Sequence, residues 1–61
     1  MTTIDRLNEL LEAERAGVKR VDALVAEALP ATVIDVLQEM KTRHLANIEA
    51  CDRLAKSLRA R

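Results

Sequence analysis

Three polar side chains interrupt otherwise apolar stripes in this sequence: Glu14 in the first half, and His44 and Asn47 in the second. Burying such groups on a helix face is costly unless they pair with one another or bind a ligand. One interpretation is a hydrogen-bonded layer that fixes the register of packed helices. Another is a metal site for iron, manganese or zinc, with Glu14 and His44 as ligands and Asn47 as a weak ligand or the hydrogen-bond partner of one. A third is that the buried stripe lies elsewhere.

The helix that must position Glu14 is predicted to run from about residue 3 to residue 28. Thr2 and Asp5 match a capping box, which places the helix start at about residue 3. Pro30 lacks an amide donor and disfavours helical geometry at Leu29, so the helix should end just before it. Apolar residues recur at steps of three and four, interrupted once at residue 14, which is typical of a helix with one apolar stripe. The stripe consists of Ile4, Leu7, Leu11, Val18, Val21, Val25 and Ala28.

The helix that must position His44 and Asn47 is predicted over about residues 32–60. Thr32 and Asp35 repeat the capping-box pattern at its start. Basic residues gather in its last turns, where cations complement the negative end of a helix: Arg53, Lys56, Arg59 and Arg61. The predicted stripe again advances in steps of three and four, and consists of Val33, Leu37, Met40, His44, Asn47, Cys51, Leu54 and Leu58, widened by Leu45, Ile48 and Ala55.

The short connection predicts which residues of the two helices lie at the same height. A link of about three residues makes the helices antiparallel neighbours. With the turn near residue 30, Glu14 lies level with residues 45–47 and within about one turn of His44 and Asn47. Gly17, the only glycine, is predicted inside the first helix, where it marks either a close helix contact or simple tolerance.

The fold class expected from these elements is all-α: one domain, residues 1–61, forming a two-helix hairpin that dimerises into a four-helix bundle. A chain this short has little core of its own. Its apolar residues, 49% of the sequence, include no aromatic side chain. A single cysteine forms no disulfide within the chain. Two copies related by a twofold axis would bury the stripes. Each copy would bring its own Glu14, His44 and Asn47 to the same height along the bundle.

Composition and motifs exclude several classes of function. Ten Lys and Arg residues balance ten Asp and Glu residues, and zero net charge argues against a nucleic-acid-binding protein. The sequence contains no pattern of a signal peptide or membrane span, so we expect a cytoplasmic protein without a membrane partner. No phosphate-binding loop, Cys-x-x-Cys pair or nucleophile elbow supports an enzyme. Cys51 is expected to be a small buried hydrophobe; the alternatives are a metal ligand and a disulfide to a second copy.

Residues 7–17, Leu-Asn-Glu-Leu-Leu-Glu-Ala-Glu-Arg-Ala-Gly, resemble the first helix of the ferritin-like superfamily, in particular its half-length members in which two hairpins dimerise. The resemblance implies that Glu14 is an inward-facing metal ligand. The family's second helix carries Glu-x-x-His, whereas Lys41 stands at the glutamate position when His44 is aligned with the histidine. An intact ferroxidase centre would need that glutamate. The resemblance therefore implies either a reduced site of Glu14 and His44, or a ferritin-like scaffold without metal.

The predicted function is a small ferritin-like homodimerising module, with or without a transition metal in its polar layer. The alternative is a helical interaction protein that binds no metal, such as a regulatory adaptor or an antitoxin-like partner. The expected partner is then the helices of another protein instead of a second copy. A metal site predicts stoichiometric metal per dimer, whereas an adaptor is indifferent to chelators.

Overall fold

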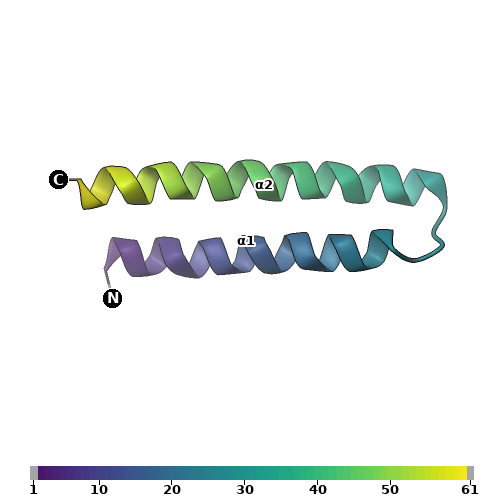
Figure 1. Cartoon of the computed structure of the whole chain (residues 1–61), viewed down its shortest axis with the longest axis horizontal. Coiled ribbons are helices and arrows are strands. Elements are labelled where there is room, and N and C mark those ends of the chain that lie inside the picture. The colour runs from purple at the N-terminus through teal and green to yellow at the C-terminus, as the bar shows by residue number, and fades with distance from the viewer. Residues whose placement is uncertain (1, 61) are drawn as a thin grey trace.

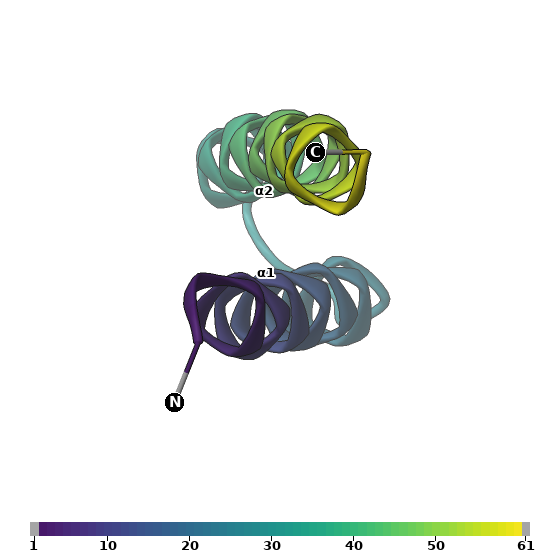
Figure 2. The same ribbon diagram turned by 90° about the vertical axis from the view of Figure 1, so that its left-hand side faces the viewer.

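The computed structural model describes residues 2–60, which form two antiparallel helices joined by a short loop (Figure 1). Helix α1 spans Thr3–Val25 and helix α2 spans Ala31–Arg59. The helices lie side by side along their length and cross at a shallow angle, as the view along them shows (Figure 2). The predicted all-α hairpin is confirmed for this part of the chain, and the four-helix bundle stays a prediction.

Helix α1 begins at the predicted capping box. The Thr2 hydroxyl accepts a hydrogen bond from the Asp5 backbone amide at 3.1 Å, and the Thr2 amide donates to the Asp5 carboxylate at 3.0 Å. Each side chain satisfies a backbone amide that the first turn of a helix leaves without a partner. The prediction of a helix start at residue 3 is therefore confirmed.

Removing the Asp5 carboxylate should destabilise the helix in a pH-dependent way. Hydrogen bonds from the backbone amide of Thr2, and then from its side chain, lower the pKa of Asp5. A carboxyl with a lowered pKa in the folded state stabilises the fold above its unfolded-state pKa, and this contribution is lost as the pH falls through the folded-state pKa. Asp5→Ala should therefore melt a few degrees below wild type at pH 7, and the two melting temperatures should converge below about pH 4. Glu12→Ala, at an exposed site further along α1, is the control, and a difference that persists in acid would contradict the capping role.

The loop is longer than predicted because α1 ends early. The helix stops at Val25, and the Glu27 amide bonds to the Leu24 carbonyl at 3.0 Å in a tighter turn. Ala28, predicted as the last residue of the apolar stripe, is exposed in the loop, whereas Leu29 is half-buried. Pro30 disfavours helical geometry only at Leu29, whereas the helix already ends at Val25. The connection is residues 26–30, not about three residues.

Helix α2 begins one residue earlier than predicted and without a side-chain cap. Pro30 is the N-cap, and its carbonyl accepts hydrogen bonds from the amides of Val33 and Ile34 at 3.0 and 3.1 Å. The predicted capping box of Thr32 and Asp35 is wrong, because Thr32 already lies inside the first turn. At the other end, Lys56 and Arg59 lie in the last turn as expected, and Arg61 lies outside the described residues.

The apolar stripe of α1 packs against α2 as predicted. Leu7, Leu11 and Val21 are buried, and Ile4, Val18 and Val25 are half-buried. Leu7 and Leu11 form a core cluster with Cys51 and Ala55 of α2, and Ile48 and Leu58 pack against its side. Cys51 therefore behaves as the predicted small buried hydrophobe.

The stripe predicted for α2 is only half correct. Leu37, Cys51 and Ala55 are buried against α1, but Val33, Met40 and Leu54 are exposed by 42%, 42% and 50% of their surface. The residues that turn toward α1, which we call the inner row of α2, also advance in steps of three and four and have a buried or half-buried side chain. They are Ile34, Leu37, Lys41, His44, Ile48, Cys51, Ala55 and Leu58.

The hairpin is elongated and leaves much of its apolar surface uncovered. Its Cα extents are 47 × 17 × 12 Å and its radius of gyration is 14.3 Å. A compact domain of this length has a radius of gyration of about 10 Å. The exposed surface of the hairpin is 4673 Å², whereas a compact monomer of the same mass exposes roughly 4000 Å². Across residues 2–60, neither helix has an apolar stretch that could cross a membrane.

Candidate functional site

The structure brings together the three polar residues that the sequence singled out. Nδ1 of His44 lies 2.5 Å from Oε2 of Glu14, and Asn47 donates its amide Nδ2 to Oε1 of Glu14 at 3.3 Å. An ionised carboxylate only accepts hydrogen bonds, so Nδ1 of His44 carries the hydrogen of the shorter contact. Each oxygen of Glu14 thus has its own partner on α2. We call Glu14, His44 and Asn47 the polar layer.

The polar layer is partly withdrawn from solvent near the middle of the hairpin. The side chains of His44 and Glu14 keep 26% and 15% of their surface exposed, whereas Asn47 lies at the surface. Within residues 2–60, every buried side-chain nitrogen or oxygen has a hydrogen-bond partner. The Glu14 carboxylate can stay between the helices at low cost only while His44 and Asn47 of α2 are hydrogen-bonded to it. The layer therefore favours one position of α2 along the axis of α1.

Gly17 explains how the His44 ring reaches Glu14. A Cβ atom at Gly17 would lie 2.7 Å from Nε2 and 2.8 Å from Cε1 of His44. Atoms of different residues do not approach so closely without bonding, so only a residue without a side chain leaves room for the ring on α1. Of the two interpretations of Gly17, the close helix contact is confirmed. Sequence reasoning placed Gly17 in the first helix but did not connect it with His44.

Substituting Gly17 by alanine should have opposite effects in two backgrounds. Alanine stabilises a helix interior by about 1 kcal/mol relative to glycine. In wild type, its methyl group meets the His44 ring, and overpacking of this kind costs about 1–3 kcal/mol. Gly17→Ala should therefore destabilise wild type but stabilise the His44→Ala variant. Urea unfolding of the four proteins at one concentration measures the coupling, and an equal change in both backgrounds would contradict the contact.

An ion pair beside the layer was not predicted. Nζ of Lys41 donates to Oδ1 of Asp22 at 2.7 Å, with the two side chains 32% and 53% exposed. Pairs this exposed contribute at most about 1 kcal/mol. The ion pair also shows how a lysine fits in the inner row of α2: its side chain extends along the helix surface and its ammonium group reaches solvent beside Asp22. Beside the layer, a shallow hollow is lined by Met40, Arg43, His44 and Asn47.

The layer of one chain offers few metal donors. Within residues 2–60, no group of three or more His, Cys, Asp or Glu side chains comes together in a way that could hold a metal ion. Glu14 and His44 are two such donors, and they are already hydrogen-bonded to each other. Cys51 belongs to the apolar cluster instead.

The chain matches no protein-family model, no curated protein and no solved structure. The resemblance of residues 7–17 to ferritin-like bundles stays a prediction from those residues. What supports a function is the polar layer and the surface around it.

Proposed function

We propose that this chain is a homodimerising helical module, in which two hairpins associate into a four-helix bundle. The observation that carries the proposal is the uncovered apolar surface: six residues form the buried apolar core, while seven large apolar side chains in residues 2–60 stay exposed. Monomeric proteins rarely expose large contiguous apolar patches. A second copy covers it and supplies the core that a chain this short lacks.

The polar layer sets the register within that module. Sliding α2 by one turn along α1, about 5.4 Å, would remove both partners from Glu14. It would also move the His44 ring off Gly17 onto a residue with a side chain. The displaced carboxylate would stay between the helices without a partner, which costs free energy. The layer therefore disfavours a shifted alignment of α1 and α2, as polar core positions do in coiled coils. Burial of apolar side chains supplies the affinity.

Concentration dependence tests the proposal. Because the bundle forms from two chains, a hundredfold rise in concentration favours it by about 2.7 kcal/mol, which should raise the melting temperature by roughly 10 °C. Circular dichroism melts across this range, with the mass from light scattering, provide the measurement. A chain that has the mass of a monomer and a melting temperature independent of concentration would exclude the homodimer.

Metal binding by the dimer is a second candidate, because a carboxylate and an imidazole already lie together in each hairpin. A dimer would contain two Glu14 and two His44 side chains, a mixed oxygen and nitrogen set that suits iron, manganese or zinc. Titration calorimetry of wild type, Glu14→Leu and His44→Met with Fe(II), Mn(II) and Zn(II) tests it. Binding by wild type alone, at a fixed metal count per dimer in native mass spectrometry, would support the metal site, and no heat with wild type would exclude it.

The ferritin-like assignment is part of the same proposal. It is supported by the inward position of Glu14 on α1 and by the antiparallel hairpin, both of which such half-length members would have. The competing proposal, an adaptor or antitoxin-like protein, uses the same exposed apolar surface for the helices of another protein. A wild-type chain that stays monomeric but binds a helical partner independently of chelators would favour it.

A further inference from the structure

The exposed apolar residues are distributed unevenly around the hairpin. Residues seven apart lie on the same side of a helix. On α1 one such row contains Leu10, Gly17 and Leu24; on α2 another contains Val33, Met40, Asn47 and Leu54, with Val36 at its edge. Of the seven large exposed apolar side chains of residues 2–60, five belong to these two rows and Val36 borders the second row, whereas the seventh is Leu45. We call Leu10, Leu24, Val33, Val36, Met40 and Leu54 the apolar face.

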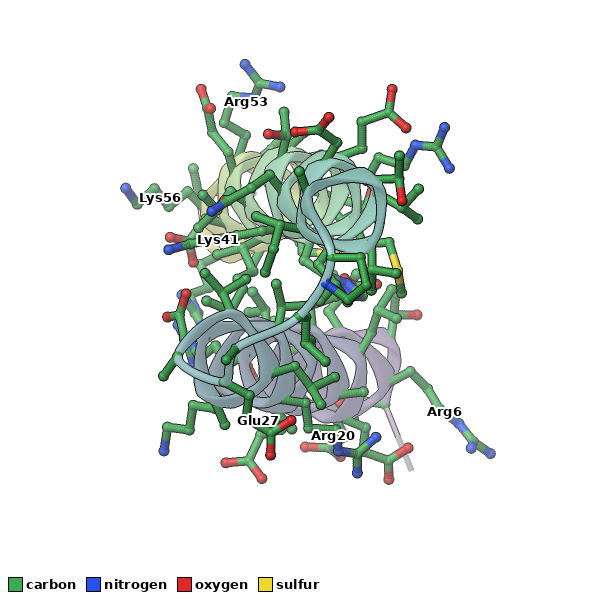
Figure 3. The ribbon with its side chains drawn as sticks, turned by 90° about the vertical axis from the view of Figure 1, so that its right-hand side faces the viewer. Arg6, Arg20, Glu27, Lys41, Arg53 and Lys56 are labelled. Atoms are coloured by element: carbon green, nitrogen blue, oxygen red, sulfur yellow. The ribbon has the colours of Figure 1, made fainter. Side chains whose placement is uncertain are left out.

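Contacts between the helices show that the two rows lie on the same side of the hairpin. Asn47 bonds to Glu14, and the His44 ring lies on Gly17, so both rows border the polar layer from one side. The Lys41–Asp22 ion pair lies nearer the loop, with Lys41 on the other side of the hairpin. Figure 3 looks along the helices and shows Lys41 and Lys56 on one side and Arg6 on the opposite side. The two rows therefore lie on the side of the hairpin that faces away from the Lys41–Asp22 ion pair.

Four residues of the apolar face are placed symmetrically about the polar layer. Gly17 and the His44 ring are in contact and mark a common height on the two helices. Leu10 and Leu24 each lie seven residues from Gly17, which is about 10 Å along the helix in either direction. Val33 and Leu54 lie eleven and ten residues from His44, which is about 15 Å in either direction. A twofold rotation about a line across the helices at this height would exchange these positions.

We infer that a second copy of this chain docks on the apolar face, related by a twofold axis that runs perpendicular to the helices at the height of Gly17 and His44. This inference rests on the proposed homodimer and specifies its surface. Leu10 then meets Leu24 of the second copy, and Val33 meets its Leu54. The two polar layers come to the same height on either side of the interface.

The area that the hairpin leaves exposed fits this occupant. Its exposed surface exceeds that of a compact monomer of its mass by roughly 700 Å². Stable dimers bury about 800 Å² on each partner. Covering the apolar face with an identical face would thus bring the exposed area per chain to the ordinary range for a folded protein.

The placement of the apolar residues favours the perpendicular axis. An axis along the helices would lay α1 on α2 of the second copy, so Leu10 would not meet Leu24 of that copy. The two Arg43 side chains approach near the perpendicular axis, but their length lets the charged groups extend to solvent.

A matched pair of variants tests the face. Met40 and Leu45 are both on α2 and are exposed to similar extents, 42% and 49%, but they lie on opposite sides. Met40→Glu should weaken the dimer by about a hundredfold or more, because it buries an unpaired charge at the interface, whereas Leu45→Glu should dimerise like wild type. Sedimentation equilibrium measures the dissociation constants.

The outcomes separate this inference from the proposed function. A wild-type chain that is monomeric throughout refutes the homodimer itself. A wild-type dimer that is broken by Leu45→Glu but not by Met40→Glu leaves the homodimer standing and overturns the apolar face as its surface.

Disulfide trapping tests the axis. Leu10→Cys and Leu24→Cys, each in a Cys51→Ala background, are oxidised separately and as a mixture. The perpendicular axis predicts a disulfide between the two variants in the mixture and little dimer from either alone. No mixed disulfide, from variants that still dimerise, would overturn the axis.

Discussion

Leu11→Asp is expected to unfold the chain and abolish association at the same time. Leu11 is only 4% exposed and lies in the cluster with Leu7, Cys51 and Ala55. Burying an unpaired carboxylate there costs several kcal/mol, while a chain of this length has, by itself, a free energy of folding close to zero. Circular dichroism should show the loss of most helical signal at micromolar concentration, and light scattering should show a monomer.

The companion change on α2 should have the same result, and an exposed site provides the control. Leu37 is a buried residue of the inner row, so Leu37→Asp should also unfold the chain. Leu45→Asp places the same charge at an exposed position on the opposite side, and should change the melting temperature by only a few degrees. A folded, helical monomer from Leu11→Asp would show that folding does not depend on this cluster or on a second copy.

The elements of this fold that depend on local sequence could be predicted. The capping box of Thr2 and Asp5 needs only residues three apart, and the stripe of α1 has only one polar interruption, so its start and buried face followed directly. The end of α1 could not be predicted in the same way. Pro30 limits where a helix can continue, but it does not determine how many residues before it the chain turns away.

The buried face of α2 could not be read from periodicity alone. Rows through Val33 and through Ile34 both advance in steps of three and four, and both are mostly apolar. Lys41 interrupts the correct row, whereas Met40 makes the neighbouring row look continuous. Contacts with α1 determine which row is buried. The Lys41 ammonium group bonds to Asp22, and the His44 ring lies in the space beside Gly17.

The polar layer was predictable in height but not in atomic detail. An antiparallel hairpin with a short loop brings Glu14 level with His44 and Asn47 whatever the side chains do, because both helices rise by the same amount per residue. The use of both Glu14 oxygens and the contact of the ring with Gly17 depend on rotation of each helix about its axis. That rotation is set by the packing of the whole interface, which no local pattern contains.

The polar layer should respond more strongly to single changes than to the double change. Glu14→Leu leaves the His44 ring and Asn47 without their acceptor, and His44→Met leaves a partly buried carboxylate with only the Asn47 bond. Each should lower the free energy of unfolding by about 1–3 kcal/mol. Glu14→Leu combined with His44→Met removes both hydrogen-bonding partners and fills the space with apolar side chains of similar size, and methionine is slim enough to lie beside Gly17. The double variant should be as stable as wild type or more stable.

The value of this comparison is that it distinguishes stability from specificity. If the layer only sets the register of α1 and α2, the double variant keeps its stability but loses the penalty against a shifted alignment of the two helices. If the layer instead holds a metal, wild type should gain stability when Fe(II), Mn(II) or Zn(II) is added, and both single variants and the double variant should lose that gain. Urea unfolding of the four proteins with and without each metal gives both answers. Additive losses in the two single variants, with a double variant less stable than either, would show that Glu14 and His44 contribute separately and not as one layer.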